Sequence, residues 1–438
     1  MHVDGRAALA APVAATLARE SARLITPLFL IAAVFPAAGR AAPQGALDLR
    51  SALALARAQN PALNASRASV AEARGELTGA SVLLRENPEV ELGAGPRWLD
   101  APGSNRQVGL EASVSQRLEI AGQRGRRVDR ASAEVAAAEA DADAAGRTVD
   151  LAVATAFYRA LGAEERVRIA GEHERLAREL LEIARARDEK GAASPVEINA
   201  ARVRAAEASR LLLRARADEE GSRARLAPLL GLDAAAPLAL QGGLPEPRDL
   251  PPATGAAVDR LPAVAAAARR LEAARAAAGL ASAAAWPDLR LGARYTTEEA
   301  SRTLLGTLSV PIPVFQRNQG ERERARAAVT RSVAEEKGVR AQATAEIREA
   351  EIERDRALQA ARLYDRDVLK ALDENLALLR RMLAAGKVSA ADAIVLQREA
   401  LEGHLGFIDA RIDLAVADAR ARTAAGLPIL DDATGGGR

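Results

Sequence analysis

Hydrophobic and polar residues alternate over several short stretches, and this pattern predicts β-strands. In residues 108–120 every second position is apolar apart from Gln116, and the positions between are small or charged. A period of two places the two sets on opposite faces of a strand. The same alternation recurs in 289–295 and 304–314, and 88–97 supplies a partner for the first strand. We therefore expect four strands, each with one apolar face.

The last predicted strand, 304–314, carries two prolines near its end. Pro311 and Pro313 both fall on its polar face. Proline has no N–H group to donate to a neighbouring strand, so it is rare inside a sheet. We expect this end of the strand to bend out of the sheet.

The segments around the predicted strands show no period of two and predict long helices. Residues 48–86 contain one proline, Pro61, and we expect a helix there. Residues 125–190 and 320–385 contain no proline. At 1.5 Å per residue, each of these two segments forms a helix of about 100 Å. Helices of that length are typical of coiled coils rather than of ordinary globular domains.

Apolar residues follow a heptad spacing on both sides of Gly386. The set comprises Leu369, Leu372, Leu376, Leu379 and Leu383, followed by Leu401, Leu405, Ile408, Ile412, Ala415 and Ala419. Alternating steps of three and four residues keep such positions on one face of a helix. We expect two antiparallel helices packed through this seam, where alanine permits close approach.

The chain is internally duplicated, because several landmarks recur at an offset of 195 residues. The pairs are Gly125 and Gly320, Ser194 and Ser389, Glu197 and Asp392, and the dipeptides Gly231-Leu232 and Gly426-Leu427. Such repeats indicate a structural unit used twice. The expected divisions are a signal peptide 1–41, a first repeat 42–232, a Pro- and Gly-rich linker 233–258, a second repeat 259–427 and a disordered tail 428–438.

The N-terminal segment resembles an export signal. Arg19 and Arg23 precede the apolar stretch 24–38, which ends in small residues. About 15 apolar residues suit a signal-peptide core better than a membrane span, which needs about 20. We expect cleavage after Ala41, with a single membrane anchor as the alternative.

Two short motifs mark the turns that follow the long helices. They read Gly191-x-x-Ser194-x-x-Glu197 and Gly386-x-x-Ser389-x-x-Asp392. Glycine ends a helix in the left-handed conformation, and serine caps the start of the next. An acidic residue three positions later completes or imitates a capping box. These residues are therefore first of all helix caps.

Composition narrows the possible functions. About a quarter of the residues are Ala, and aromatic residues make up only 2%, which favours long helices over a thick globular core. The 61 basic and 59 acidic residues are interspersed, so no nucleic-acid-binding patch is expected. The chain contains no Cys, which excludes thiolate metal sites, cysteine nucleophiles and lipidation on cysteine.

Few side chains in the sequence are candidates for metal binding or catalysis. His2, His173 and His404 are the only histidines, and we expect no metal site from them. Adjacent acids such as Glu335 and Glu336 lie among arginines in predicted helices. We therefore expect them to belong to solvent-exposed helix surfaces rather than to act as catalytic acid–base pairs. We expect no catalytic residue, no cofactor and no enzyme activity.

Strand number constrains assembly. A closed barrel in a membrane needs about eight strands or more, because open strand edges cannot face lipid. Four strands per chain cannot close. If these strands cross a membrane, two chains supply eight strands and three chains supply twelve, and geometry alone leaves both open.

Two segments that lead out of the second and fourth strands carry a family likeness. They are SQRLEIAGQRGRRV at 115–128 and VPIPVFQRNQGE at 310–321. Together with the signal peptide and the duplicated order of helix, two strands, long helix and helix, they resemble the TolC-like outer-membrane efflux family and, within it, the heavy-metal (CzcC-type) branch. The likeness covers nearly the whole mature chain.

This resemblance implies a mainly α fold with a small β part. Long antiparallel coiled-coil helices would form a trimeric α-barrel, and the four strands of each chain would contribute to a shared 12-stranded outer-membrane β-barrel. The partners would be two further copies of the chain, outer-membrane lipid, a periplasmic adaptor and an inner-membrane RND pump. The function would be passive conduction of heavy-metal cations from periplasm to exterior.

The resemblance also assigns roles to the turn residues. Gly191, Ser194, Glu197, Gly386 and Ser389 would lie at the tips that contact the adaptor. Asp392 would lie at the tunnel entrance, where three copies place three carboxylates around one axis and attract cations.

Other functions stay open. The same fold serves drug efflux or type I secretion, and the exported ion or compound is not defined by these patterns. A periplasmic coiled-coil structural or adaptor protein without membrane strands is a further alternative. The strand alternation and the duplicated turns favour the channel over that protein.

Overall fold

In the computed structural model, Ala42–Arg438 form one compact unit. The structure describes residues 45–97, 107–191, 194–247, 255–298, 301–364, 366–385, 387–388 and 390–430, all in this unit. The expected signal peptide and the end of the expected tail lie outside these ranges. The signal peptide, its cleavage site and the repeat boundaries therefore stay predictions.

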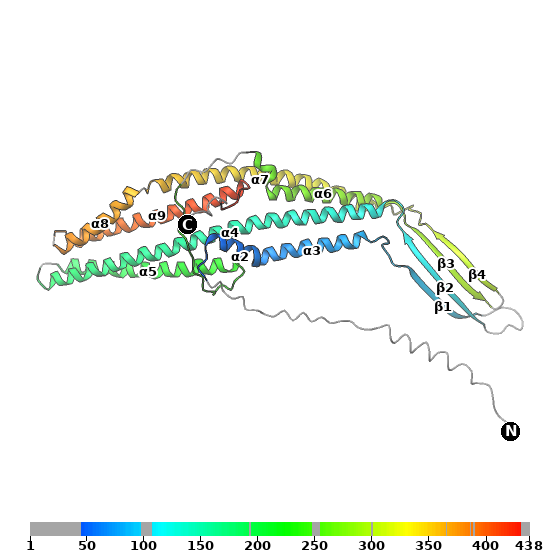
Figure 1. Ribbon diagram of the computed structural model, residues 1–438, viewed down its shortest axis with the longest axis horizontal. Helices are drawn as coiled ribbons and strands as arrows, with labels where there is room; N and C mark the ends of the chain where they lie inside the picture. The colour runs from blue at the N-terminus through cyan, green and yellow to red at the C-terminus, as the bar shows by residue number, and fades with distance from the viewer. Residues whose placement is uncertain are drawn as a thin grey trace, which may run out of the picture. The chain divides into compact units, whose positions relative to one another are not determined.

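The described elements are mostly helices, with four strands, and they appear in the same order in each half of the chain (Figure 1). The first set is α2 Leu49–Gln59, α3 Pro61–Ser81, β1 Glu89–Arg97, β2 Gln107–Leu118, α4 Gln123–Asp188 and α5 Pro195–Leu229. The second is η2 Gly255–Arg260, α6 Pro262–Ala283, β3 Leu289–Glu298, β4 Ser301–Ser309, α7 Gln319–Arg362, α8 Arg366–Ala384 and α9 Ala390–Ala424. The predicted mainly α chain with four strands is confirmed. None of the described helices is long and apolar enough to cross a membrane.

The four strands form one antiparallel sheet in the order β1-β2-β3-β4. The central pairing, β2 with β3, joins the two halves of the chain. Its register aligns Leu92, Ala112, Tyr295 and Leu304 in one row across the sheet. Because successive residues of a strand point to opposite faces, the predicted apolar positions all share one face.

Strand β4 is shorter than predicted, because it ends at Ser309 instead of residue 314. The segment that follows contains Pro311 and Pro313 and leads to α7 without strand pairing. The expected departure from the sheet is therefore observed, and it begins before the first proline. Proline has no N–H group to donate to a neighbouring strand, so pairing does not continue into the segment that contains Pro311 and Pro313.

The single helix predicted for 48–86 is wrong, because the chain breaks between α2 and α3. The Asn60 side chain caps α3, accepting hydrogen bonds from the backbone N–H groups of Ala62 (2.9 Å) and Leu63 (3.3 Å). Its amide nitrogen donates to the carbonyl of Leu229 at 2.8 Å. Proline at the first position of α3 suits a helix start. Asn-Pro is thus a helix boundary here.

The long helix predicted in the first half is confirmed, whereas its counterpart in the second half is broken. Helix α4 runs for 66 residues. The expected helix 320–385 is instead divided into α7 and α8, and neither proline nor glycine stands at the break. There the ring of Tyr364 packs 6.3 Å from that of Phe407 and lies against Gly406, where any Cβ would overlap it. A tertiary contact accompanies this break.

Helix α4 is the common partner of the helices around it. It packs against α3, α5, α6 and α9, while α7 packs against α6 and α9. Ile408 and Ile412 of the predicted heptad seam share a buried cluster with Ile169 of α4, so part of that seam does not join α8 to α9. The largest buried cluster lies where α2, α4 and α5 meet, around Val153, Phe157 and several leucines.

Candidate functional site

The turn between α4 and α5 has the geometry that its motif predicted. Gly191 has φ +69°, and its N–H donates to the carbonyl of Asp188 at 2.7 Å. The Ser194 hydroxyl accepts a hydrogen bond from the backbone N–H of Glu197 at 3.2 Å. Gly191 and Ser194 are exposed and Glu197 is half-buried. The motif caps two helices and still presents its residues on the surface.

The turn between α8 and α9 is described only in part. Gly386 and Ser389 lie outside the described residues, while Asp392 is exposed in the first turn of α9. The helices that lead to the two turns nevertheless touch. Leu180 of α4 packs with Leu379 and Ala393 in one buried cluster, and Glu179 pairs with Arg380 at 3.6 Å. The structure therefore brings the two turns to the same end of the bundle (Figure 1).

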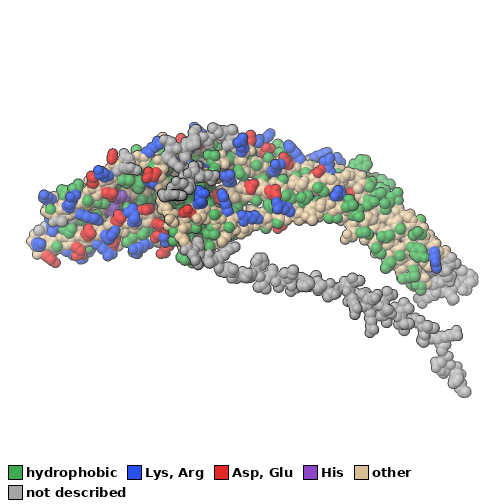
Figure 2. Space-filling model, viewed as in Figure 1, with side chains coloured by type: hydrophobic (Ala, Val, Ile, Leu, Met, Phe, Trp, Pro, Cys, Tyr) green, Lys and Arg blue, Asp and Glu red, His purple; other side chains and the backbone are tan. Residues whose placement is uncertain are grey.

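The sheet has two chemically different faces. One carries exposed apolar side chains, among them Leu92 at 78% and Leu304 at 75% exposure. Figure 2 shows hydrophobic side chains gathered over the strands, whereas acidic and basic side chains are interspersed over the helices. An apolar patch of this kind marks contact with a membrane or another protein.

The other face carries three Arg–Glu ion pairs. They join Arg117 to Glu86 (2.8 Å), Arg290 to Glu89 (3.3 Å) and Arg294 to Glu111 (3.1 Å). All six side chains are at least two-fifths exposed, so these pairs belong to a wet surface and contribute little to stability. This face can line water while the opposite face meets an apolar medium.

The two family-like segments form the same joint between strand and helix. Gly122 (φ +75°) and Asn318 (φ +56°) take the left-handed conformation just before α4 and α7. The side-chain oxygen of the next residue, Gln123 or Gln319, then accepts from the backbone N–H two positions earlier, at 2.6 and 2.7 Å. These joints are 196 residues apart, so the expected pairing of Gly125 with Gly320 is wrong by one position.

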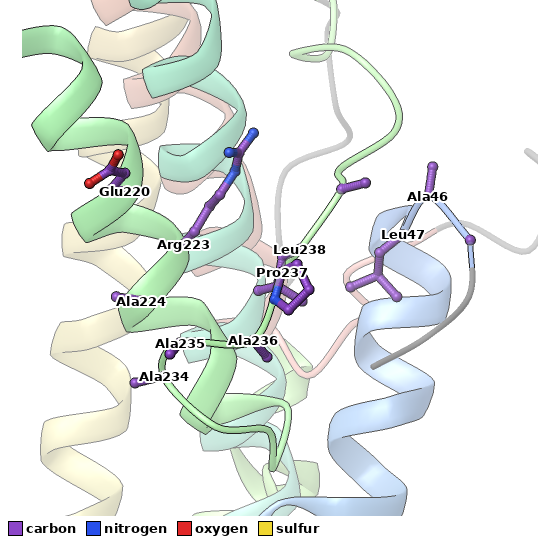
Figure 3. A pocket seen from close by; sticks show the side chains of 12 residues that line it. Ala46, Leu47, Glu220, Arg223, Ala224, Ala234, Ala235, Ala236, Pro237 and Leu238 are labelled. Atoms are coloured by element: carbon purple, nitrogen blue, oxygen red, sulfur yellow. The ribbon is translucent and has the colours of Figure 1, made fainter. Parts of the chain in front are cut away.

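A pocket of about 930 Å³ lies between the end of α5 and the segments before α2 and after α5 (Figure 3). Half of its lining residues are alanine, and the others include Leu47, Leu238 and two charged side chains, Glu220 and Arg223. Arg223 already pairs with Glu164 at 2.7 Å and with Glu219 at 3.0 Å. We assign no chemistry to this pocket.

Two histidines that are far apart in the sequence meet inside the helical bundle. The rings of His173 on α4 and His404 on α9 lie 5.7 Å apart, centre to centre. The sequence does not indicate that these two histidines meet, although His404 shares a helix face with Leu401 and Ile408 of the heptad pattern, and this placement predicts that it is buried. Among the described residues, no three His, Cys, Asp or Glu side chains are placed to hold a metal ion together.

The chain is similar in sequence to known outer-membrane efflux proteins. The family model described as outer membrane efflux protein matches residues 52–232 and 254–427. The cobalt-zinc-cadmium resistance protein CzcC of Cupriavidus metallidurans is 26% identical over 280 residues, which are 63% of this chain and 65% of that protein. The match therefore spans less than two thirds of the length of this curated relative.

Solved structures show the same fold. A crystal structure of CusC, described as forming a transmembrane channel, superposes with a TM-score of 0.71 at 18% identity, covering 87% of this chain and 92% of the other. A membrane protein from Pseudomonas aeruginosa gives a TM-score of 0.73 at 21% identity, with 86% and 92% covered. Because the family model covers both halves, from the helices through the strands to the turns, the chain belongs to the outer membrane efflux protein family.

Proposed function

We propose that this chain is the outer-membrane channel subunit of a tripartite RND-type efflux system and passively conducts heavy-metal cations from periplasm to exterior. As a family member it is an outer-membrane protein with a periplasmic helical extension. The two-faced sheet is the main support for the conducting role. Its exposed apolar face suits contact with lipid, and its ion-paired polar face suits contact with water. The relative named for cobalt, zinc and cadmium resistance supports the choice of cargo.

The channel is proposed to be a homotrimer. The described sheet has four strands with β1 and β4 as its outer strands, and a membrane barrel must have no open edge. Pairing β4 of one copy with β1 of the next closes a barrel of twelve strands in three copies. An eight-stranded barrel fills its interior with side chains, whereas a larger one leaves a water-filled bore. Conduction therefore favours three copies over two.

Cargo selection is proposed to lie mainly in the inner-membrane pump. Three arginines of the polar sheet face form ion pairs with glutamates, and tight ligands in a conduit would slow release. Drug efflux remains the second candidate, because such a surface carries no feature restricted to metal ions.

A deletion strain tests the proposed cargo. Removing the gene is expected to sensitise cells to zinc, cobalt or cadmium, and restoring it on a plasmid is expected to return resistance. Sensitivity should be measured as growth across a dilution series of each salt, alongside a panel of hydrophobic drugs. Unchanged metal tolerance with increased drug sensitivity would instead favour drug efflux, and no change in either would argue against efflux altogether.

The helix turns are proposed to dock the periplasmic adaptor. The tip set is Gly191, Ser194, Glu197, Gly386 and Ser389, with Asp392 proposed at the tunnel entrance. The exposure of the first turn and the packing of Leu180 against Leu379 and Ala393 support one shared docking end.

Replacing Gly191 with valine tests the docking role. A Cβ at Gly191 meets nothing within 4 Å, so the fold should tolerate a side chain apart from local strain at φ +69°. We expect Gly191→Val to reduce metal resistance to that of the deletion strain while oligomers still reach the outer membrane. Gly191→Asn is the control, since asparagine accepts the left-handed conformation with less bulk at Cβ. Full resistance in the valine variant would exclude Gly191 from docking.

A further inference from the structure

The His173–His404 contact is a buried polar contact between two helical hairpins. His173 is 3% exposed and His404 8% exposed. Their rings meet edge to face with an interplanar angle of 62°. Within the part of the chain that the structure describes, the Nδ1 atom of each ring is buried without a hydrogen-bond partner. Buried polar atoms of this kind are rare in native proteins and call for an explanation.

Each element packed around the contact adds charged or polar groups. On α9, the fully buried Gln397 donates to the backbone carbonyl of His173 at 2.9 Å. Arg204 on α5 lies 3.4 Å from the side-chain oxygen of Gln397. It also pairs with Glu207 of the same helix at 3.5 Å. From α8, Asp373 lies 3.2 Å from Nε2 of His404.

The remaining charges near the contact are paired with one another. On α4, Glu174 is buried and pairs with Arg178 while accepting from the Ser209 hydroxyl at 2.9 Å. Arg380 of α8 pairs with Glu179 of α4 at 3.6 Å. The buried carboxylate of Glu174 beside His173 thus already has partners, and Asp373 contacts His404 rather than His173.

A proton on His173 is disfavoured in this setting. Burial, together with the nearby His404, Arg204 and Arg380, lowers the pKa of His173 to about 4. The imidazole is therefore neutral in the packed bundle at neutral pH. If the helices separate and His173 meets water, its pKa returns to about 6.5.

We propose that the His173–His404 contact is an acid-sensitive latch that holds α4 against α9 at neutral pH and releases it when His173 takes up a proton. The latch lies 15 residues from the end of α4, or about 22 Å from the α4–α5 turn. Its release loosens the two hairpins near their turns while the core around Phe157 stays packed. The latch is a property of the bundle and does not depend on the proposed cargo.

The sign and size of the effect follow from proton linkage. Because the separated state has the higher pKa, it binds more protons between pH 6.5 and 4, so the packed state loses stability as the pH falls through that range. The equilibrium constant for separation should rise about 30-fold between pH 8 and pH 5 and saturate near 300-fold below pH 4.

A single-cysteine reporter measures this separation in the full-length protein. The chain has no Cys, so Ala400→Cys introduces a unique thiol on α9, one turn before His404, at a position 3% exposed. Labelling with 2,2′-dithiodipyridine, which reacts with thiols in acid, should be normalised to a model thiol at each pH. We expect the normalised rate to rise about 30-fold from pH 8 to pH 5.

Two matched variants decide whether His173 is responsible. Adding His173→Gln and, in a separate protein, His173→Phe should each reduce the pH response to below about 3-fold. Ala154→Cys, fully buried on α4 in the Phe157 cluster, should stay protected throughout. A flat wild-type response, a response that survives both His173 variants, or parallel exposure of Ala154→Cys would overturn the latch. A response abolished by EDTA would assign the contact to a bound metal and overturn it as well.

Discussion

Gly231→Ala is expected to lower the free energy of unfolding by about 3 kcal/mol or more, and so to be among the most damaging single-methyl additions in the protein. Gly231 follows α5 with φ +75°, where a side chain costs about 1–2 kcal/mol. A Cβ there would also lie 2.7 Å from the carbonyl carbon of Gln59 and overlap its oxygen. These are backbone atoms at the end of α2, so no side-chain rotation can relieve the contact.

The duplicated chain supplies its own control for this prediction. Gly426 is the repeat equivalent of Gly231 and has nearly the same φ, +74°, but a Cβ there first meets the tip of the Leu261 side chain at 3.3 Å. Gly426→Ala should therefore cost only the conformational part, about 1–2 kcal/mol. Guanidinium unfolding of both variants, followed by helical circular dichroism, gives the comparison. Equal losses would show that the approach of Gln59 is unimportant.

Leu304→Glu is expected to prevent most of the protein from assembling in the outer membrane, whereas Leu305→Glu is expected to be tolerated. Leu304 lies opposite Tyr295 on the apolar face of the sheet, and Leu305 lies opposite Arg294 on the polar face. A carboxylate on the lipid side costs roughly 2 kcal/mol per copy, a cost that is repeated in every copy of an oligomer. On the other face, a carboxylate lies beside Arg294, whose charge it can share with Glu111.

The two neighbouring leucines make a matched pair, since both are more than half exposed and undergo the same substitution. The measurement is the amount of heat-modifiable oligomer in the outer-membrane fraction, compared with total protein. Similar assembly of both variants would contradict lipid contact on the Leu304 face. Loss of assembly with Leu305→Glu alone would reverse the assignment of the faces.

Much of the local structure could be predicted because it depends on near neighbours in the chain. The alternation of residues 108–120 encodes a two-faced strand, and the Gly191 and Ser194 motif encodes two helix caps whose hydrogen bonds span three residues. Proline at 311 and 313 signals the early end of β4. Each of these features rests on backbone geometry that a few adjacent residues control.

The errors arise where a residue distant in the sequence decides the outcome. Asn60 ends α2 and caps α3 while its amide reaches Leu229, 169 residues away. The break before α8 coincides with Tyr364 lying against Gly406 and Phe407, which no helix propensity at the break indicates. Ile408 and Ile412 follow a heptad spacing that would allow packing against either α8 or α4. Only the tertiary structure shows that they pack with α4.

The sequence by itself determined the kinds of element, their duplicated order, the two-faced strands and the caps at the turns, because periodicity and capping are local and repeat in both halves. Only the tertiary structure decided that β2 pairs with β3 across the halves, that the helices leading to the two turns pack together, and that His173 meets His404. These are contacts between segments more than 150 residues apart. Several helices and strands have similar apolar faces, so each face could pack against more than one partner. Which partner it meets depends on how all the elements pack together, and the residues of one segment do not specify it.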